Sequence, residues 1–253
     1  MRKTTKAIVL AAGGLAVASL IGLAVTGYEI GWGPFRGLFK GYGDEVKAIE
    51  QRYDASARKG EIVFYGASNF RLWTEMENDL SGYKVQNHGF GGSTDKMLVQ
   101  YADRILYPYE PAVVFFQTGS NDYVALSGTD DEKVAMCMAF KREMFDTFHA
   151  ALPEAKFVVM SGLLLPGRDQ YRALTERINA ELKELCAGRD YMFFVDASAM
   201  TRDGADYRTD LFIKDRIHLN HEGQLLWMQE YIRPQIEELI GTYGLDDLRR
   251  NGT

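Results

Sequence analysis

The sequence predicts an α/β fold of the doubly wound kind, in which helices cover both faces of a parallel sheet. Short apolar runs, typical of strands buried on both sides, alternate with longer segments whose apolar residues recur at helical spacing. The length of 253 residues, without internal repeats, suits one such domain with a short appendage. Eight strands are not available, so an open sheet is favoured over a closed barrel.

Five apolar runs are predicted as strands: residues 62–65, which end at Gly66, and residues 84–87, 112–117, 157–160 and 192–195. Helices are predicted between them, over residues 44–57, over 94–107, from a cap at Asp130 or Asp131, from about 171 to 185, and from about His221 onward. The long helix after Asp131 should bury Cys137, Phe140, Met144, Phe148 and Leu152. Pro234 should kink or divide the last helix.

Residues 1–27 have the composition of a membrane signal anchor or a signal peptide. Arg2, Lys3 and Lys6 precede nineteen uncharged residues, 7–25, which as a helix would span about 28 Å, close to the ~30 Å hydrocarbon core of a bilayer. This run exceeds the apolar core of a cleaved signal peptide, so an uncleaved anchor is favoured over a cleaved one. Either way we expect the domain to be extracytoplasmic, anchored to the membrane or secreted.

The remaining chain divides into a linker rich in glycine and aromatic residues, 28–43, and a globular domain, 44–253. The formal net charge is −6, and it becomes −9 without the three basic residues of the first segment. An acidic domain argues against nucleic acid as the partner. The sequence does not indicate an oligomeric state.

Ser68 is the predicted nucleophile. The strand ending at Gly66 leads directly into Ala67, Ser68 and Asn69, a sharp turn at the carboxyl end of a strand, where ligands bind in open α/β sheets. A serine at such a turn is more often a helix cap than a catalyst, so the prediction depends on the partners that other strand ends supply.

Three later segments carry the groups that a serine nucleophile needs. His218 is the predicted general base, and Asp215, three residues earlier, would orient its ring and stabilise the imidazolium. The predicted oxyanion hole consists of the backbone N–H groups of Ser68 and Gly92 and the side-chain amide of Asn121. Each segment alone is a weak signal, but together, on successive strand ends, they indicate acyl transfer.

The same segments resemble the SGNH-type (GDSL-like) serine hydrolases over residues 62–240. The four diagnostic residues of that family correspond to Ser68 in Gly-Ala-Ser-Asn, Gly92 in Asn-His-Gly-Phe-Gly-Gly-Ser, Asn121 in Gly-Ser-Asn-Asp and His218 in Asp-Arg-Ile-His. The resemblance implies a flavodoxin-like three-layer α/β/α sandwich with strand order 2-1-3-4-5. It also implies ester hydrolysis without a metal or cofactor, with Asp215 as the acid of the triad. The usual Gly-Asp-Ser-Leu block is altered here, since Ala67 replaces the aspartate.

Four side chains on the predicted loops are candidates to contact the substrate: Phe70, Trp73, Tyr123 and Arg168. Each is equally well explained as a partly buried anchor of its loop. The histidines lack paired ligand spacing, so no metal site is expected.

The predicted function is that of an exported serine esterase acting on small acyl groups, above all acetyl, with a small-molecule or glycan ester as substrate. Carbohydrate or cell-envelope polymers are the favoured alcohols. Two alternatives use the same triad: an O-acyltransferase of the cell envelope, and an acylhydrolase of the lysophospholipase or lipase type. A binding module without catalysis is the weakest interpretation, because binding would not need all five polar groups.

Overall fold

The computed structural model describes residues 42–118 and 120–250. The predicted signal anchor, and the linker up to residue 41, lie outside the described residues. The chain divides into two compact units after residue 48. The structure describes only residues 42–48 of the first unit, where helix α2 (Gly43–Arg52) begins. Helix α2 ends at Arg52, so it is shorter than the helix predicted over residues 44–57.

The second unit contains the predicted parallel sheet. Its five strands follow the order β2-β1-β3-β4-β5, and every pair is parallel. The strands are β1 (Ile62–Gly66), β2 (Val85–Asn87), β3 (Val113–Gln117), β4 (Lys156–Met160) and β5 (Met192–Val195). In register, Phe64 lies beside Asn87 on one side and Phe115 on the other. Both the doubly wound class and the order 2-1-3-4-5 are thus confirmed.

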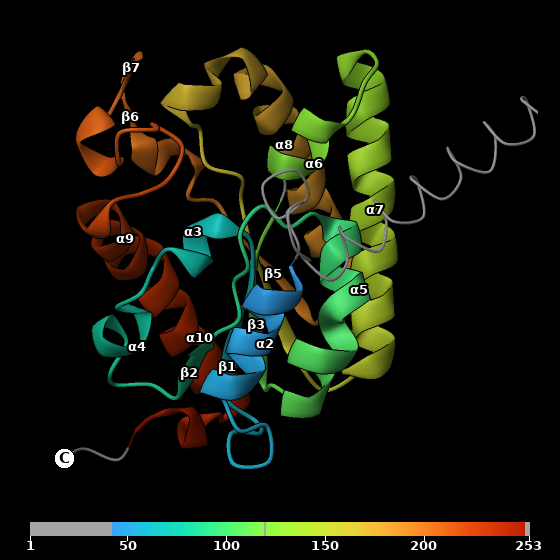
Figure 1. The fold of residues 1–253 in the computed structure, drawn as a ribbon, viewed down its shortest axis with the longest axis vertical. Helices are drawn as coiled ribbons and strands as arrows, with labels where there is room; N and C mark the ends of the chain where they lie inside the picture. Colours follow the sequence, from blue (N-terminus) through green and yellow to red (C-terminus); the bar gives the residue numbers. More distant parts are fainter. Residues whose placement is uncertain (1–41, 119, 251–253) are drawn as a thin grey trace, which may run out of the picture. The chain divides into compact units, whose positions relative to one another are not determined.

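Helices form a layer on each face of the sheet (Figure 1). One layer holds α5 (Asp95–Ile105), α7 (Asp130–Ala151) and α8 (Arg172–Ala187). The other holds α3 (Ser68–Arg71), α4 (Met76–Asp79), α9 (His221–Trp227) and α10 (Arg233–Tyr243). The short α6 (Ser120–Ala125) follows β3, and the hairpin β6 (Arg202–Asp203) and β7 (Asp206–Tyr207) follows β5.

Successive residues of β1 contact the two helical layers in turn, as a strand buried on both faces requires. Phe64 packs edge-on against Phe70 of α3, which stacks on Trp227 of α9. Tyr65 points the other way: its hydroxyl donates to the carbonyl of Leu98 in α5 at 2.6 Å. All five residues of β1 are buried.

The structure corrects two details of the long helix α7. Thr129, rather than Asp130 or Asp131, is its N-cap, because the Thr129 hydroxyl and the Glu132 carboxylate form a reciprocal capping box. The buried face carries Lys141, at 1% exposure, where an apolar side chain is expected; Phe140 is only half-buried.

The last helical segment is divided as predicted. A π-helical stretch, Met228–Ile232, lies between α9 and α10, and Pro234 is at the start of α10.

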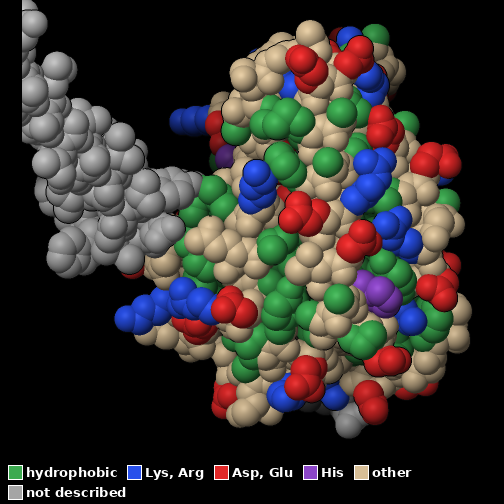
Figure 2. All heavy atoms as spheres, turned by 90° about the vertical axis from the view of Figure 1, so that its right-hand side faces the viewer, with side chains coloured by type: hydrophobic (Ala, Val, Ile, Leu, Met, Phe, Trp, Pro, Cys, Tyr) green, Lys and Arg blue, Asp and Glu red, His purple; other side chains and the backbone are tan. Residues whose placement is uncertain are grey.

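None of the described helices combines the length and apolarity that crossing a membrane requires. On the face shown in Figure 2, acidic and basic side chains are interspersed over the described surface. This mixture is typical of a solvated protein surface.

Candidate active site

Ser68 lies at the carboxyl end of the central part of the sheet. β1 ends at Gly66, and α3 begins at Ser68, which is partly exposed. A β-carbon at Gly66 would lie 2.4 Å from the Gln117 carbonyl oxygen, so only glycine lets β1 approach the end of β3 this closely. The turn predicted from the sequence therefore places the Ser68 hydroxyl beside the segment that follows β3.

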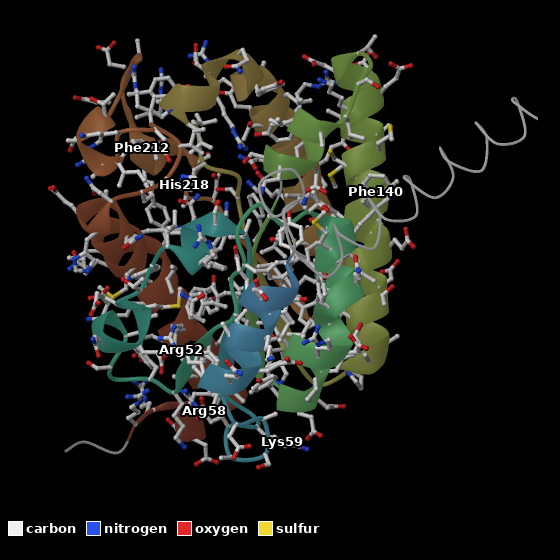
Figure 3. The ribbon with its side chains drawn as sticks, in the orientation of Figure 1. Arg52, Arg58, Lys59, Phe140, Phe212 and His218 are labelled. Atoms are coloured by element: carbon white, nitrogen blue, oxygen red, sulfur yellow. The ribbon has the colours of Figure 1, made fainter. Side chains whose placement is uncertain are left out.

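Ser68, His218 and Asp215 form a continuous hydrogen-bonded chain. The Ser68 Oγ lies 2.7 Å from His218 Nε2, and His218 Nδ1 lies 2.6 Å from Asp215 Oδ2. His218 is on the loop before α9, and Figure 3 shows it next to α3. The three residues predicted as a triad, separated by about 150 positions in the chain, are thus brought within hydrogen-bonding distance.

Asp215 is held as a carboxylate. Its partial burial alone would raise its pKa, but hydrogen bonds from the His218 ring and from the backbone N–H groups of His218 and Ile217 outweigh this and lower the pKa of Asp215. Those backbone bonds are 3.0 and 2.9 Å long and are accepted by Oδ1, which leaves Oδ2 for the imidazole. The arrangement favours the tautomer with a proton on Nδ1 and an unprotonated Nε2 facing Ser68.

Asn69 ties the serine turn to the histidine loop. Its side chain is buried, and its Oδ1 accepts a hydrogen bond of 3.2 Å from the backbone N–H of Leu219. Ala67 is also buried, and its N–H donates to the Gln117 carbonyl at 3.1 Å. The atypical Gly-Ala-Ser-Asn block thus supports Ser68 through Asn69 and the backbone.

The predicted oxyanion donors come from three neighbouring turns. The Ser68 N–H belongs to the first turn of α3, where amide donors have no partner within the helix. Gly92 has a φ of +78°, a left-handed conformation that favours glycine. Asn121 Nδ2 donates one hydrogen to the Ser93 carbonyl at 3.0 Å, which joins the glycine turn to the asparagine turn.

A buried ion pair lies beneath these turns. Lys141 Nζ is 2.9 Å from Asp95 Oδ2, with side-chain exposures of 1% and 0%. Nζ also donates to Thr118 Oγ1 at 2.7 Å, and the Asp95 N–H donates to Asp122 Oδ1 at 3.0 Å. Asp95 follows the glycine turn and Thr118 precedes the asparagine turn, so one lysine holds both segments together.

Asp122 is predicted to make the stability of the folded protein depend on pH. Burial, and then the negative charge of Asp95, raise the pKa of Asp122 to about 7, and its Oδ2 has no hydrogen-bond partner among the described residues. The native state therefore binds a proton that the unfolded state releases near pH 4, so the free energy of unfolding should fall as pH rises from about 4 to about 7. In Asp122→Asn this contribution should be absent. Urea unfolding of both proteins at pH 5, 6, 7 and 8 measures it; parallel pH dependences would contradict the assignment to Asp122.

A small pocket of about 290 Å³ opens over Ser68. It is lined by residues of the serine turn, the β3 end and two loops: Ala67, Ser68, Asn69, Gln117, Thr118, Ser120, Asn121, Leu165, Arg168 and Ile217. A larger pocket of about 920 Å³ lies near Lys59, Lys84 and Gly244, away from this site, and carries none of the predicted catalytic residues.

Of the four side chains expected to contact substrate, only Arg168 lines the pocket. Phe70 and Trp73 are fully buried in the core with Trp227, and Tyr123 is 2% exposed with its hydroxyl bonded to Thr175 at 2.7 Å. The expectation for these three aromatic residues is corrected, because apolar rings next to a strand end gain more from the core than from a polar pocket. Gly92 is not among the lining residues either; the residue after it, Ser93, accepts the hydrogen bond from Asn121.

The prediction missed Lys141, Ser120 and Asn69 as parts of the site. A signal for Lys141 existed: it lies four residues after Cys137 and three before Met144, on the stripe that should be apolar. Ser120 and Asn69 are small polar residues in turns, for which the sequence offers no distinguishing pattern. Among the described residues, no cluster of three or more His, Cys, Asp or Glu side chains could hold a metal ion.

Comparison with known proteins identifies the family. A family model for GDSL-like lipases and acylhydrolases matches residues 39–226, which is most of the chain. No curated protein matches the chain.

Several solved structures share the fold. One is a Streptococcus pneumoniae protein provisionally described as a platelet activating factor, at 18% identity and a TM-score of 0.62, covering 85% of this chain and 95% of that one. A GDSL-like lipase from Bacteroides thetaiotaomicron is 20% identical with a TM-score of 0.55, covering 78% and 96%. A variant of an acetyl-xylooligosaccharide esterase from Geobacillus is 17% identical with a TM-score of 0.52, covering 66% and 91%.

The family match covers the serine turn, the glycine and asparagine turns and the loop of His218. The chain therefore belongs to the GDSL-like lipase/acylhydrolase family, and it is a serine hydrolase that acts on carboxylic ester bonds.

Proposed function

We propose that this protein is an extracytoplasmic esterase that removes short acyl groups, above all acetyl, from carbohydrate or cell-envelope esters. Ser68 would be the nucleophile, His218 the general base and acid, and Asp215 the residue that orients the imidazole. The observation that carries the proposal is the hydrogen-bonded chain from Ser68 Oγ through His218 to Asp215, with contacts of 2.7 and 2.6 Å.

In this mechanism Ser68 Oγ attacks the ester carbonyl carbon while its proton passes to His218 Nε2. The carbonyl oxygen becomes an oxyanion, which the N–H groups of Ser68 and Gly92 and the Asn121 amide would stabilise. His218 then returns the proton to the departing alcohol oxygen, and an acyl ester of Ser68 remains. Water, deprotonated by the same imidazole, releases the acid and restores the hydroxyl.

The size of the pocket supports a short acyl group. The pocket has about 290 Å³ of empty space, against about 920 Å³ for the pocket near Lys59. Leu165 and Ile217 are its larger apolar lining residues. A long acyl chain would need an apolar channel, whereas an acetyl methyl group would not.

Residues 1–27 support the extracytoplasmic location. Three basic residues precede nineteen uncharged ones, the pattern of a membrane anchor or an export signal with its basic end in the cytoplasm.

A chain-length series of p-nitrophenyl esters tests the proposal. We expect kcat/KM to be highest for acetate or propionate and at least about tenfold lower for octanoate, because the pocket does not accommodate added methylenes. Highest activity on octanoate or longer esters would instead indicate a lipase or lysophospholipase. Adding a glycan acceptor and separating free acetate from acetylated glycan distinguishes hydrolysis from acyl transfer.

Asn121→Ala should lower kcat by roughly 10² to 10³, with a smaller effect on KM. The alanine removes an oxyanion donor that acts mainly in the transition state, and it also leaves the Ser93 carbonyl without its bond from Asn121 Nδ2. Steady-state kinetics on p-nitrophenyl acetate measure the change, and thermal unfolding checks the fold. A kcat within about threefold of wild type would remove Asn121 from the oxyanion hole.

A further inference from the structure

Arg168 places a positive charge in the pocket of Ser68 without a carboxylate to balance it. It is half-buried, on the 3-10 segment Pro166–Tyr171, and it lines the pocket. One guanidinium nitrogen, Nη1, donates to Ser120 Oγ. The two terminal nitrogens, Nη1 and Nη2, lie 3.5 and 3.4 Å from Asn121 Oδ1. Both partners are neutral groups.

In the part of the chain that the structure describes, no carboxylate lies within 4.0 Å of the Arg168 guanidinium. The acidic residue beside it is engaged elsewhere: Asp169 accepts from the Tyr207 hydroxyl at 2.7 Å and lies 3.8 Å from Arg172. A partly buried arginine usually has an anionic partner, since removing its charge from water is costly. The missing anion at this position suggests that a ligand supplies it.

Two further cationic residues lie on the loop that carries His218. Lys214 and Arg216 flank Asp215 and are exposed, and neither has a carboxylate within 4.0 Å among the described residues. The one acidic group between them, Asp215, is bonded to His218. The chain as a whole has a net charge of −6, so cationic side chains on this loop would favour anionic substrates that the rest of the surface repels.

We propose that this pocket selects esters bearing a carboxylate close to the scissile bond, with the Arg168 guanidinium as the receptor of that carboxylate. This inference rests on the proposed function and specifies its substrate class. The planar guanidinium can keep its bond to Ser120 and offer its remaining N–H donors to both oxygens of a carboxylate. The carboxylate could belong to the acyl group, as in a succinyl ester, or to the alcohol, as in an acetylated acidic sugar.

Two pairs of esters, in which one member carries a carboxylate and the other is neutral, separate these sources. Mono-p-nitrophenyl succinate and p-nitrophenyl butyrate test a carboxylate on the acyl side. The acetyl esters of 3-hydroxybenzoate and 3-hydroxybenzamide, followed by pH-stat titration, test one on the alcohol side. For each pair the readout is the ratio of kcat/KM for the charged ester to that for the neutral one.

Wild type should prefer the charged ester of at least one pair by about 10- to 100-fold, as expected for a charge-assisted hydrogen bond. Arg168→Gln should bring that ratio near one, and Arg168→Lys should retain part of it, because lysine keeps the charge but not the planar fork. Arg168 also contacts Asn121, so activity on both esters should fall in Arg168→Gln, and the ratio isolates recognition of charge. Arg172→Gln is the matched control: it removes the same charge four residues away, outside the pocket, and should keep the wild-type ratio.

A wild-type ratio near one for both pairs would overturn the inference, and so would a preference that persists in Arg168→Gln. If the neutral butyrate is hydrolysed in a Ser68-dependent way in either case, the proposed esterase function stands and only the substrate class fails. If no ester of either pair is hydrolysed, the proposed function itself fails.

Discussion

The kcat of Ser68→Ala on p-nitrophenyl acetate is expected to be about 10⁶-fold lower than that of wild type, as when the nucleophile of a catalytic triad is removed. The alanine lacks the only atom that could form the acyl ester, while His218 and Asp215 stay in place 2.6 Å apart. Any residual rate would come from water acting in a site that still holds the oxyanion donors. KM should change much less than kcat.

Ser81→Ala is the matched control for that experiment. Ser81 is exposed, in the turn after α4, and is not among the residues that line the pocket over Ser68. Its activity should equal that of wild type, and both variants should unfold at the wild-type temperature. Equal activity of Ser68→Ala and wild type would contradict the mechanism.

Lys141→Met is expected to lower the free energy of unfolding by about 3–5 kcal/mol, the usual cost of removing one partner of a buried ion pair. Asp95, which is fully buried, would lose its cation, and Thr118 Oγ1 would lose its donor. Burial would lower the pKa of Lys141, but the charges of Asp95 and Asp122 outweigh it and raise that pKa, so the lysine is charged at neutral pH.

The double variant Lys141→Met, Asp95→Asn separates charge from packing. Because it removes both charges, it should recover a large part of the lost stability, and the two changes should be strongly non-additive. Lys183→Met, on the exposed side of α8, is the control and should stay within about 0.5 kcal/mol of wild type. Urea unfolding of wild type, Lys141→Met, Asp95→Asn, the double variant and Lys183→Met gives the comparison. A loss below about 1 kcal/mol in Lys141→Met would mean that the ion pair does not hold the two turns.

The sheet was predictable because each strand is apolar along its whole length. β5 was predicted to the residue, and the other strands to within one residue at each end. A parallel strand buried on both faces leaves a run of apolar residues bounded by polar ones, which is a local pattern. The strand order came from the family resemblance, because apolar runs carry no information about which strands are neighbours.

The candidate triad was predictable for a different reason. Ser68, Asp215 and His218 lie in short polar segments after or between apolar elements, and the carboxyl ends of parallel strands share one edge of the sheet. Recognising that edge is enough to expect these segments to converge, even across about 150 residues. Their roles in catalysis remain predictions to be tested by substitution.

Side-chain direction was harder to predict than position. Phe70 and Trp73 follow Ser68 closely, but α3 turns them into the core, whereas Arg168, on an irregular loop, reaches Ser120 and the pocket. Lys141 interrupts an apolar stripe because Asp95, a carboxylate from another segment, pairs with it there. Such long-range charge pairing leaves only an indirect trace in the sequence: a lysine where a helix should be apolar.

The most direct measurement of the central claim is covalent labelling with an organophosphonate ester followed by peptide mass spectrometry. The account predicts one phosphonyl group per chain, on Ser68, with activity lost in proportion to labelling, and no labelling of Ser68→Ala. Labelling at another residue, or full activity with Ser68 completely modified, would contradict it.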